Sequence, residues 1–115
     1  MIKTKRVYEP PGEDDGVRIL VDRLWPRGLR KNEAKIDLWL KDVAPSDTLR
    51  KWFNHDLAKA KEFKNQYLKE LSERQELVKR IMQCANDADV TLLYGAKEEK
   101  CNNATVLKEY LEDRR

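Results

Sequence analysis

Hydrophobic positions along the chain predict strands near its start and one more toward its end. Apolar side chains gather over residues 2–8 and 17–21, and the second run is nearly continuous in apolar character, as buried parallel strands are. Residues 36–40 alternate apolar and polar side chains, which predicts a third short strand. The clearest buried strand is expected at residues 90–94, so four strands are predicted in all.

In most of the remaining sequence, apolar side chains recur at helical spacing, which predicts helices there. Pro45 is followed by Ser46 and Asp47, which predicts a capped helix start and a helix that ends near Phe53. From residue 57 onward, apolar positions three or four apart form two stripes, broken weakly at residues 72–74, and the second stripe ends near residue 87. A last amphipathic helix closes the chain after residue 102.

The order of these elements predicts an α/β fold. The helix–strand–helix passage at the end of the chain is the crossover that a parallel sheet requires. We therefore expect a small, mostly parallel sheet with helices packed on its faces. No repeat or linker divides the sequence, so residues 1–115 are expected to form a single compact domain.

Composition narrows the classes of function more than it selects one. The 115 residues carry 24 basic and 21 acidic side chains, a net charge of only +3. This excess is too small to indicate nucleic-acid binding by itself, because strongly basic patches carry that signal. No secretory leader or membrane-length apolar run is present, and we expect a protein of the cytoplasm.

Cysteine and histidine usage argues against a metal centre. Cys84 and Cys101 are far apart, which fits neither a disulfide framework nor the spacing of a zinc site. His55 is the one histidine of the sequence, so a histidine-based metal cage is excluded. We expect no resident metal, and no cofactor is indicated.

Polar clusters follow two of the predicted strands and supply the candidate binding residues. In open α/β sheets, ligands bind at the carboxyl ends of the strands, so neighbouring parallel strands would bring both clusters to one edge. The first cluster follows residue 21 and the second begins at the end of the last strand. Their members are Asp22, Arg23, Trp25 and Arg27 in the first, and Tyr94, Lys97, Cys101 and Asn102 in the second.

These side chains fit recognition of a phosphate or carboxylate group. Arginine forks make paired contacts to such anions, Lys97 adds a point charge, and backbone N–H groups at residues 102–105 would donate further. Trp25 is a candidate for stacking on a planar ligand, and Arg50 would add a further cation. Asp22 either orients an arginine or accepts from a ligand hydroxyl; the alternative is that it pairs with an arginine to close the sheet edge.

Two residues are candidates for proton transfer or nucleophilic attack. His55 could act as a general acid or base, although capping of the preceding helix is the favoured interpretation. Cys101 could form a nucleophilic pair with His55, but nothing in the sequence places them together. Trp39 and Trp52 lie in amphipathic elements and are predicted to pack in the core.

The run at residues 17–28, VRILVDRLWPRG, resembles the signature of the domain of unknown function 488 family, in its YeaO-like branch. The resemblance covers essentially the whole chain, continuing through residues 36–41, 44–46, 49–53, 55–56, 91–94 and 102–104. It implies a small cytoplasmic α/β protein of bacterial type and implies no activity. That branch usually has histidine just before the paired asparagines, where this chain has Cys101.

Three functions follow from these observations. The first is a domain that binds or acts on a small phosphorylated or nucleotide-like ligand at the strand-end site, with its standing as an enzyme open. The second is a nucleic-acid-binding or regulatory module in which Arg23, Arg27, Arg30 and Lys31 contact phosphates. The third is a small interaction domain that dimerises through exposed aromatic side chains; no membrane partner is expected.

Overall fold

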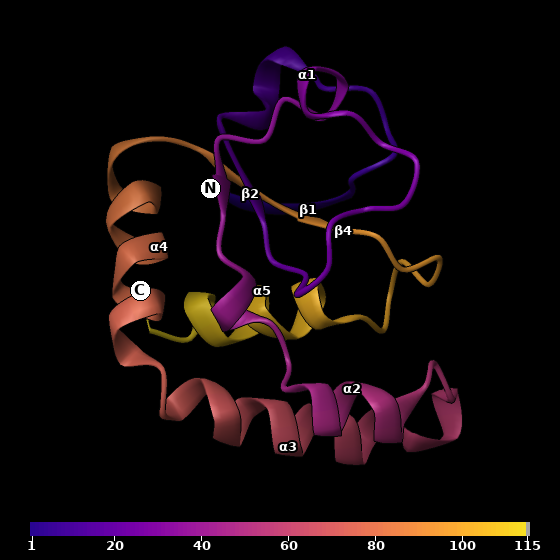
Figure 1. Cartoon of the computed structure of the whole chain (residues 1–115). Helices are drawn as coiled ribbons and strands as arrows, with labels where there is room; N and C mark the ends of the chain where they lie inside the picture. Colours follow the sequence, from indigo (N-terminus) through magenta and orange to yellow (C-terminus); the bar gives the residue numbers. More distant parts are fainter. Residues whose placement is uncertain (115) are drawn as a thin grey trace.

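A parallel sheet forms the centre of the protein in the computed structural model (Figure 1). The structure describes residues 1–114; the predicted domain runs to Arg115, which lies outside the described part. Within it, the strands are β1 (Ile2–Arg6), β2 (Val17–Leu20), β3 (Leu38–Trp39) and β4 (Val90–Tyr94). Their order is β1-β4-β2-β3 and every neighbouring pair is parallel, which confirms the predicted α/β class.

Helices occupy the segments in which apolar side chains recur at helical spacing. They are α1 (Lys31–Ala34), α2 (Asp47–Phe53), α3 (Ala60–Ser72), α4 (Gln75–Asp87) and α5 (Asn103–Glu112), with short 3-10 turns at Glu13–Asp15, Lys41–Val43 and Leu57–Lys59. The main difference from prediction is β3, which has two ladder residues instead of five. The single turn of α1 ends just before it, and Lys35 leaves that turn in a left-handed conformation with φ of 49°.

The predicted cap of α2 is confirmed, and it also docks the helix. The Ser46 side chain accepts from the backbone N–H of Leu49, which satisfies one donor at the start of α2. The Ser46 hydroxyl and backbone N–H both donate to the carboxylate of Glu70 in α3, at 2.6 and 2.8 Å. The position of α2, and of the residues that follow it, is therefore set by α3.

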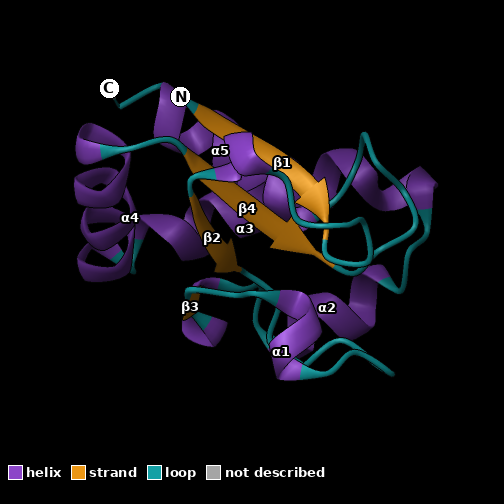
Figure 2. Ribbon diagram, turned by 90° about the horizontal axis from the view of Figure 1, so that it is seen from above, coloured by secondary structure: helices purple, strands orange, loops and turns teal. Residues whose placement is uncertain are grey.

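The long helices lie on one side of the sheet (Figure 2). Helix α5 packs against β1 and β4, and α3 packs against α5 on the side away from the strands, as Figure 1 shows below the sheet. The opposite face is covered by the connection from β2 to β3, which contains α1. Thus helical structure covers both faces, but very unequally.

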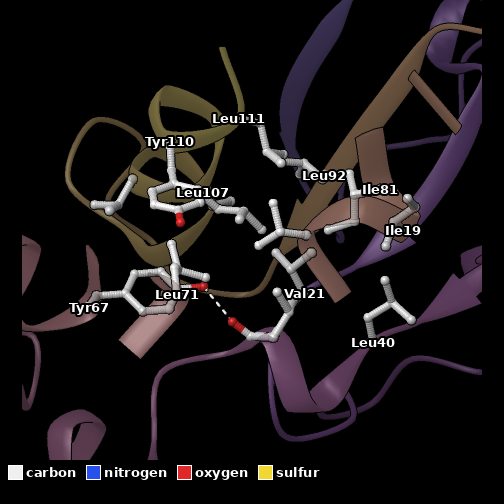
Figure 3. Packing of buried hydrophobic residues seen from close by; sticks show 14 of the residues in the cluster. Ile19, Val21, Leu40, Tyr67, Leu71, Ile81, Leu92, Leu107, Tyr110 and Leu111 are labelled. Atoms are coloured by element: carbon white, nitrogen blue, oxygen red, sulfur yellow. Dashed lines mark hydrogen bonds between the residues drawn. The ribbon is translucent and has the colours of Figure 1, made fainter. Parts of the chain in front are cut away.

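The larger core lies between the sheet and the long helices (Figure 3). Ile19 and Leu92 on the strands pack in one buried cluster with Ile81 of α4 and Leu107 of α5. Tyr67 of α3 is fully buried there, and its hydroxyl donates to the carbonyl oxygen of Val43 at 2.7 Å. This bond satisfies the one polar group of a side chain that otherwise serves packing.

A smaller core on the opposite face contains Val7, Leu20 and Leu93, with Trp25, Leu29 and Ile36 packed against them. A buried ion pair lies on the same face: Arg18, a residue that is 4% exposed, pairs with Asp15, and its guanidinium donates to the carbonyl oxygens of Ala34 and Lys35. Asp15 also accepts from Lys5 at 2.8 Å. Burial opposes ionisation of Asp15, but hydrogen bonds from Lys5, the Gly12 backbone and Arg18 lower its pKa to about 2.

The prediction that Trp39 and Trp52 pack in the core is wrong. Trp39 is 38% exposed because β3 is an edge strand; its ring meets Trp25 edge-on at 5.5 Å, and its Nε1 donates to the backbone oxygen of Asp22. Trp52 is 42% exposed on α2, where the Lys59 ammonium lies 5.0 Å from its ring centroid. Helical or alternating spacing alone did not show which side of these short elements faces the core.

Candidate functional site

The carboxyl ends of β2 and β4 lie side by side. Leu20 pairs with Leu93 in the parallel ladder, and the backbone N–H of Val21 donates to the carbonyl oxygen of Leu93. The two polar clusters that follow these strands therefore begin at the same sheet edge, and the predicted juxtaposition is confirmed. The carboxyl edge of a parallel sheet is the usual place for a ligand in an α/β protein.

A cleft of about 660 Å³ opens at this edge. Its walls come from residues 22–27 after β2, residues 44–45 before α2, the end of α2 and the two residues that follow it, and the loop that joins β4 to α5. Of the predicted site residues, Asp22, Arg23, Trp25, Arg27, Arg50, His55, Cys101 and Asn102 all line it. A volume of this size suits a small organic ligand.

Asp22 is held on the cleft wall by two hydrogen bonds, one from the residue that follows β4 and one from the start of α5. The backbone N–H of Gly95 donates to Asp22 Oδ2 at 2.8 Å, and the Asn103 side-chain amide donates to Asp22 Oδ1 at 3.0 Å. No arginine among residues 1–114 forms an ion pair with Asp22. The alternative in which Asp22 pairs with an arginine to close the sheet edge is therefore wrong.

Burial changes the acidity of Asp22. Removal from water raises the pKa of this carboxyl above its ordinary value, and it outweighs the hydrogen bonds from Asn103 and Gly95 and the charge of His55, which all lower it. A carboxyl with a raised pKa inside a cleft is a recurring feature of binding and catalytic sites.

Two of the predicted arginines are engaged by the protein itself. Arg23 directs its guanidinium at the backbone oxygens of Pro45 and Ala44, at 3.3 and 3.4 Å, with Asp42 and Asp47 nearby. Arg50 pairs with Asp47 at 3.3 Å. Arg23 is therefore held by the wall of the cleft, whereas Arg50 is tied to Asp47 through one nitrogen.

Arg27 and Lys51 are cations of the cleft whose side chains have no partner within residues 1–114. Both side chains are exposed, both line the cleft, and neither forms a hydrogen bond or ion pair with another residue in the described part of the chain. The backbone of Arg27 is fixed by Tyr8, whose hydroxyl donates to its carbonyl oxygen at 2.9 Å. The cleft thus presents two positive side chains without a partner among residues 1–114, together with one half-buried carboxyl.

His55 reaches the cleft through an unusual backbone. Helix α2 ends at Asn54 with φ of 44°, and His55 follows with φ of 56°, so two consecutive residues other than glycine are left-handed. Such residues are uncommon and cluster at functional sites. The favoured interpretation of His55 as the helix cap is not supported, because Asn54 holds that position and donates to Arg50.

Cys101 and His55 line the same cleft, which the sequence could not show. Cys101 is exposed in the loop between β4 and α5, and it forms no disulfide. Their convergence makes both side chains available to a bound molecule. It does not by itself make them a nucleophile and a base.

The remaining predicted site residues have different positions. Tyr94 is 3% exposed and packs in the larger core, outside the cleft lining. Lys97 lines a shallower neighbouring cavity of about 570 Å³, which shares His55 with the cleft. Asn102 caps α5 by accepting from the backbone N–H of Thr105 at 3.0 Å, so the prediction that this N–H donates to a ligand is wrong.

Trp25 forms a fixed part of the cleft wall. Its Nε1 donates to the backbone oxygen of Leu29 at 2.7 Å, and its ring contacts Trp39. Because two contacts hold the half-buried ring, it offers a rigid planar surface at little cost in conformational entropy.

Sequence reasoning missed three contributors, Lys51, Gly95 and Asn103. Asn103 donates to the backbone oxygen of Val21 as well as to Asp22, so it joins α5 to the end of β2. Its place at the start of a predicted helix, and that of Gly95 directly after a buried strand, were the available signals. Lys51 gave no signal, because it belongs to α2, whose position depends on the contact of Ser46 with Glu70 in α3.

Within residues 1–114, neither a metal site nor a membrane-spanning helix is found. The structure shows no group of three His, Cys, Asp or Glu side chains arranged to hold a metal ion. In the same residues, every helix is too short or too polar to cross a bilayer.

Comparison with known proteins gives matches that span nearly the full length. A family sequence model described as the inactive DUF488-N3 subclade matches residues 1–115. The chain is 44% identical over 110 residues to the uncharacterised protein YeaO of Escherichia coli K12, which covers 96% of each chain. It is 36% identical over 113 residues to the uncharacterised proteins Rv3073c of Mycobacterium tuberculosis and Mb3100c of Mycobacterium bovis, covering 98% of this chain and 95% of theirs. No solved structure matches significantly.

Proposed function

The chain belongs to the DUF488 family. From the geometry of its cleft, we propose that it is a binding domain for a small phosphorylated or nucleotide-like ligand. The subclade that matches is described as inactive, which favours binding over chemical turnover. In this proposal His55 and Cys101 contact the ligand and need not act as catalysts.

The observation that carries the proposal is the pair of unpaired cations in the cleft. Arg27 lines the cleft from the segment after β2, and Lys51 lines it from α2. Neither has an acidic partner among the described residues. A guanidinium binds phosphate through two parallel hydrogen bonds, and an ammonium adds a compact charge. Both side chains are exposed, so they are accessible to a ligand that enters the cleft.

The wall formed by Trp25 supports a ligand that also carries a planar group. Its ring is fixed by Leu29 and Trp39, and a nucleobase packed against such a surface would add aromatic contact to the phosphate interaction.

A ligand panel tests this function directly. Thermal melting is measured with nucleoside monophosphates, sugar phosphates and short oligonucleotides on the parent protein and on Arg27→Ala, Lys51→Ala and Arg80→Ala. Arg80 is an exposed residue of α4 outside the cleft, so its variant removes the same charge without touching the site. A ligand at a hundred times its Kd adds about 2.7 kcal/mol of stability.

We expect a phosphorylated small molecule to stabilise the parent and Arg80→Ala, and to stabilise the two cleft variants much less. Stabilisation that is equal in all four proteins would contradict the assignment of the cleft. Binding only by oligonucleotides, with a steep loss of affinity in salt, would favour the nucleic-acid module instead. A mass that rises with concentration and no response to any ligand would favour the dimerising domain.

A further inference from the structure

The position of the Asp22 carboxyl restricts what the ligand can be. We propose that the ligand is a hydroxyl-bearing phosphate, such as a ribose phosphate or nucleotide, whose hydroxyl groups donate to Asp22 while its phosphate binds Arg27 and Lys51. This inference rests on the proposed function and names the class of ligand that the same site would select.

The carboxylate of Asp22 has acceptor positions that the protein does not use. Each carboxylate oxygen accepts one hydrogen bond from the protein, from Gly95 on one side and Asn103 on the other. An ionised carboxylate has about four acceptor positions, so about half of them remain for a donor in the cleft. Gly95 directly follows β4 and Asn103 is the first residue of α5, so the acceptor is already oriented before a ligand arrives.

The negative and positive side chains of the cleft differ in how deeply they are buried. Asp22 is half-buried where the strands end, whereas Arg27 and Lys51 are exposed. A phosphate placed beside Asp22 would be repelled by the carboxylate, while one placed at the two cations is attracted. The ligand therefore needs an uncharged donor next to Asp22, at a distance from its phosphate.

A hydroxyl fits this position better than an amine does. A cationic amine at Asp22 would add positive charge to a cleft that already holds Arg27 and Lys51 without acidic partners among residues 1–114. A hydroxyl donates the same hydrogen bond without adding positive charge.

Gly95 has no side chain next to the Asp22 carboxylate. A Cβ atom at this position would lie 3.3 Å from Asp22 Oδ2, closer than ordinary van der Waals contact. The backbone of Gly95 does not require glycine through a left-handed φ, since the positive-φ glycines are Gly16 and Gly28. Glycine at residue 95 therefore leaves the carboxylate open to the cleft.

Two pairs of ligands that differ only in hydroxyl groups provide the test. Isothermal titration compares adenosine 5′-monophosphate with its 2′,3′-dideoxy form, and ribose 5-phosphate with 2-deoxyribose 5-phosphate. The proteins are the parent, Asp22→Asn, Gly95→Ala and the control Asp87→Asn, in which the changed carboxyl is exposed at the end of α4. Circular dichroism and thermal melting establish that each variant is folded.

We expect the parent and Asp87→Asn to bind the hydroxylated member of at least one pair about tenfold more tightly, as loss of a hydrogen bond to a charged acceptor implies. In Asp22→Asn and Gly95→Ala that ratio should fall toward one. If either variant fails to fold, the ligand pairs on the parent still decide.

Equal affinity of the parent for both members of each pair would overturn this inference and leave the proposed function standing. Phosphate ligands that bind through Arg27 and Lys51 but discriminate equally well in Asp22→Asn would also overturn it. Failure of every phosphorylated probe, inorganic phosphate included, to bind the parent would overturn the proposed function together with the inference.

Discussion

The side-chain amide of Asn103 lies 3.0 Å from the Oδ1 atom of Asp22 and joins the first residue of α5 to the end of β2. The same amide donates to the backbone oxygen of Val21 at 3.1 Å. One side chain therefore fixes both the backbone and the carboxyl of the strand end that forms the cleft. Assembly of the site and packing of the last helix depend on the same contacts.

Replacement of Asn103 by alanine should destabilise the protein by about 1–3 kcal/mol. It leaves the Val21 oxygen without this donor and removes a hydrogen bond to Asp22, whose pKa should then rise further. Urea denaturation at pH 7 measures the loss. Asn86→Ala, at an exposed position in α4, is the control, and an equal effect of both changes would contradict the role given to Asn103.

Asp22 should make the fold less stable at neutral pH than in acid. Burial raises its pKa in the folded state above the ordinary 3.8, so as pH rises the unfolded chain releases this proton first. The stability of the parent relative to Asp22→Asn should then fall as pH rises from below 3.8, and level off above the pKa of the folded state. Denaturation curves between pH 3 and 7 test the sign, and a relative stability that rises over this window would refute it.

Asp15 should show the opposite dependence on pH. Its pKa of about 2 in the folded state is below the ordinary 3.8, so the ionised carboxyl stabilises the fold above pH 3.8 and this contribution is lost as pH falls toward 2. The shift corresponds to about 2 kcal/mol at pH 7. Asp15→Asn should lose at least that amount at pH 7, and the difference from the parent should narrow below pH 3.8 in the same denaturation series.

Gly16 and Gly28 offer a matched pair of glycine substitutions. Both have positive φ, 66° and 77°, but a Cβ at Gly16 would lie 2.1 Å from the backbone oxygen of Asp89, while nothing lies within 4 Å of one at Gly28. Alanine at Gly28 should cost about 1 kcal/mol for the backbone conformation alone. Alanine at Gly16 should cost about 3 kcal/mol or more, since the chain must also move. Thermal melts of the two variants compare these costs, and equal values would show that the close approach to Asp89 has no effect.

Local patterns of the sequence were sufficient for most of the fold. Continuous apolar runs identified β2 and β4, because both faces of a parallel sheet are buried, and Ser46 was identified as a cap because a helix start needs an acceptor for its first donors. Trp39 and Trp52 were misplaced because two-residue strands and seven-residue helices are too short for periodicity to define an inner face.

The site was predictable only where it lies next to a strand end. Asp22, Arg23, Trp25 and Arg27 follow β2 directly, and their placement in the cleft needed only the adjacency of β2 and β4. The contributions of Lys51 and His55 depend on where α3 holds α2, which is set by the contact of Ser46 with Glu70. Contacts of this kind join residues far apart in the sequence and leave no local pattern.

The order of strands also governs when the sheet can form during synthesis. Strand β4 lies between β1 and β2, and Val90 pairs with both Ile2 and Val17. Neither of these two residues can pair until the segment that contains Val90 has been made. Until the ribosome has released that segment, β1 has no neighbour, and β2 has only the short β3 beside it. Closure of such long loops is slow relative to local contacts, and unpaired strand edges are prone to association in the meantime. Truncation before residue 90 would therefore remove the middle of the sheet and leave an aggregation-prone chain.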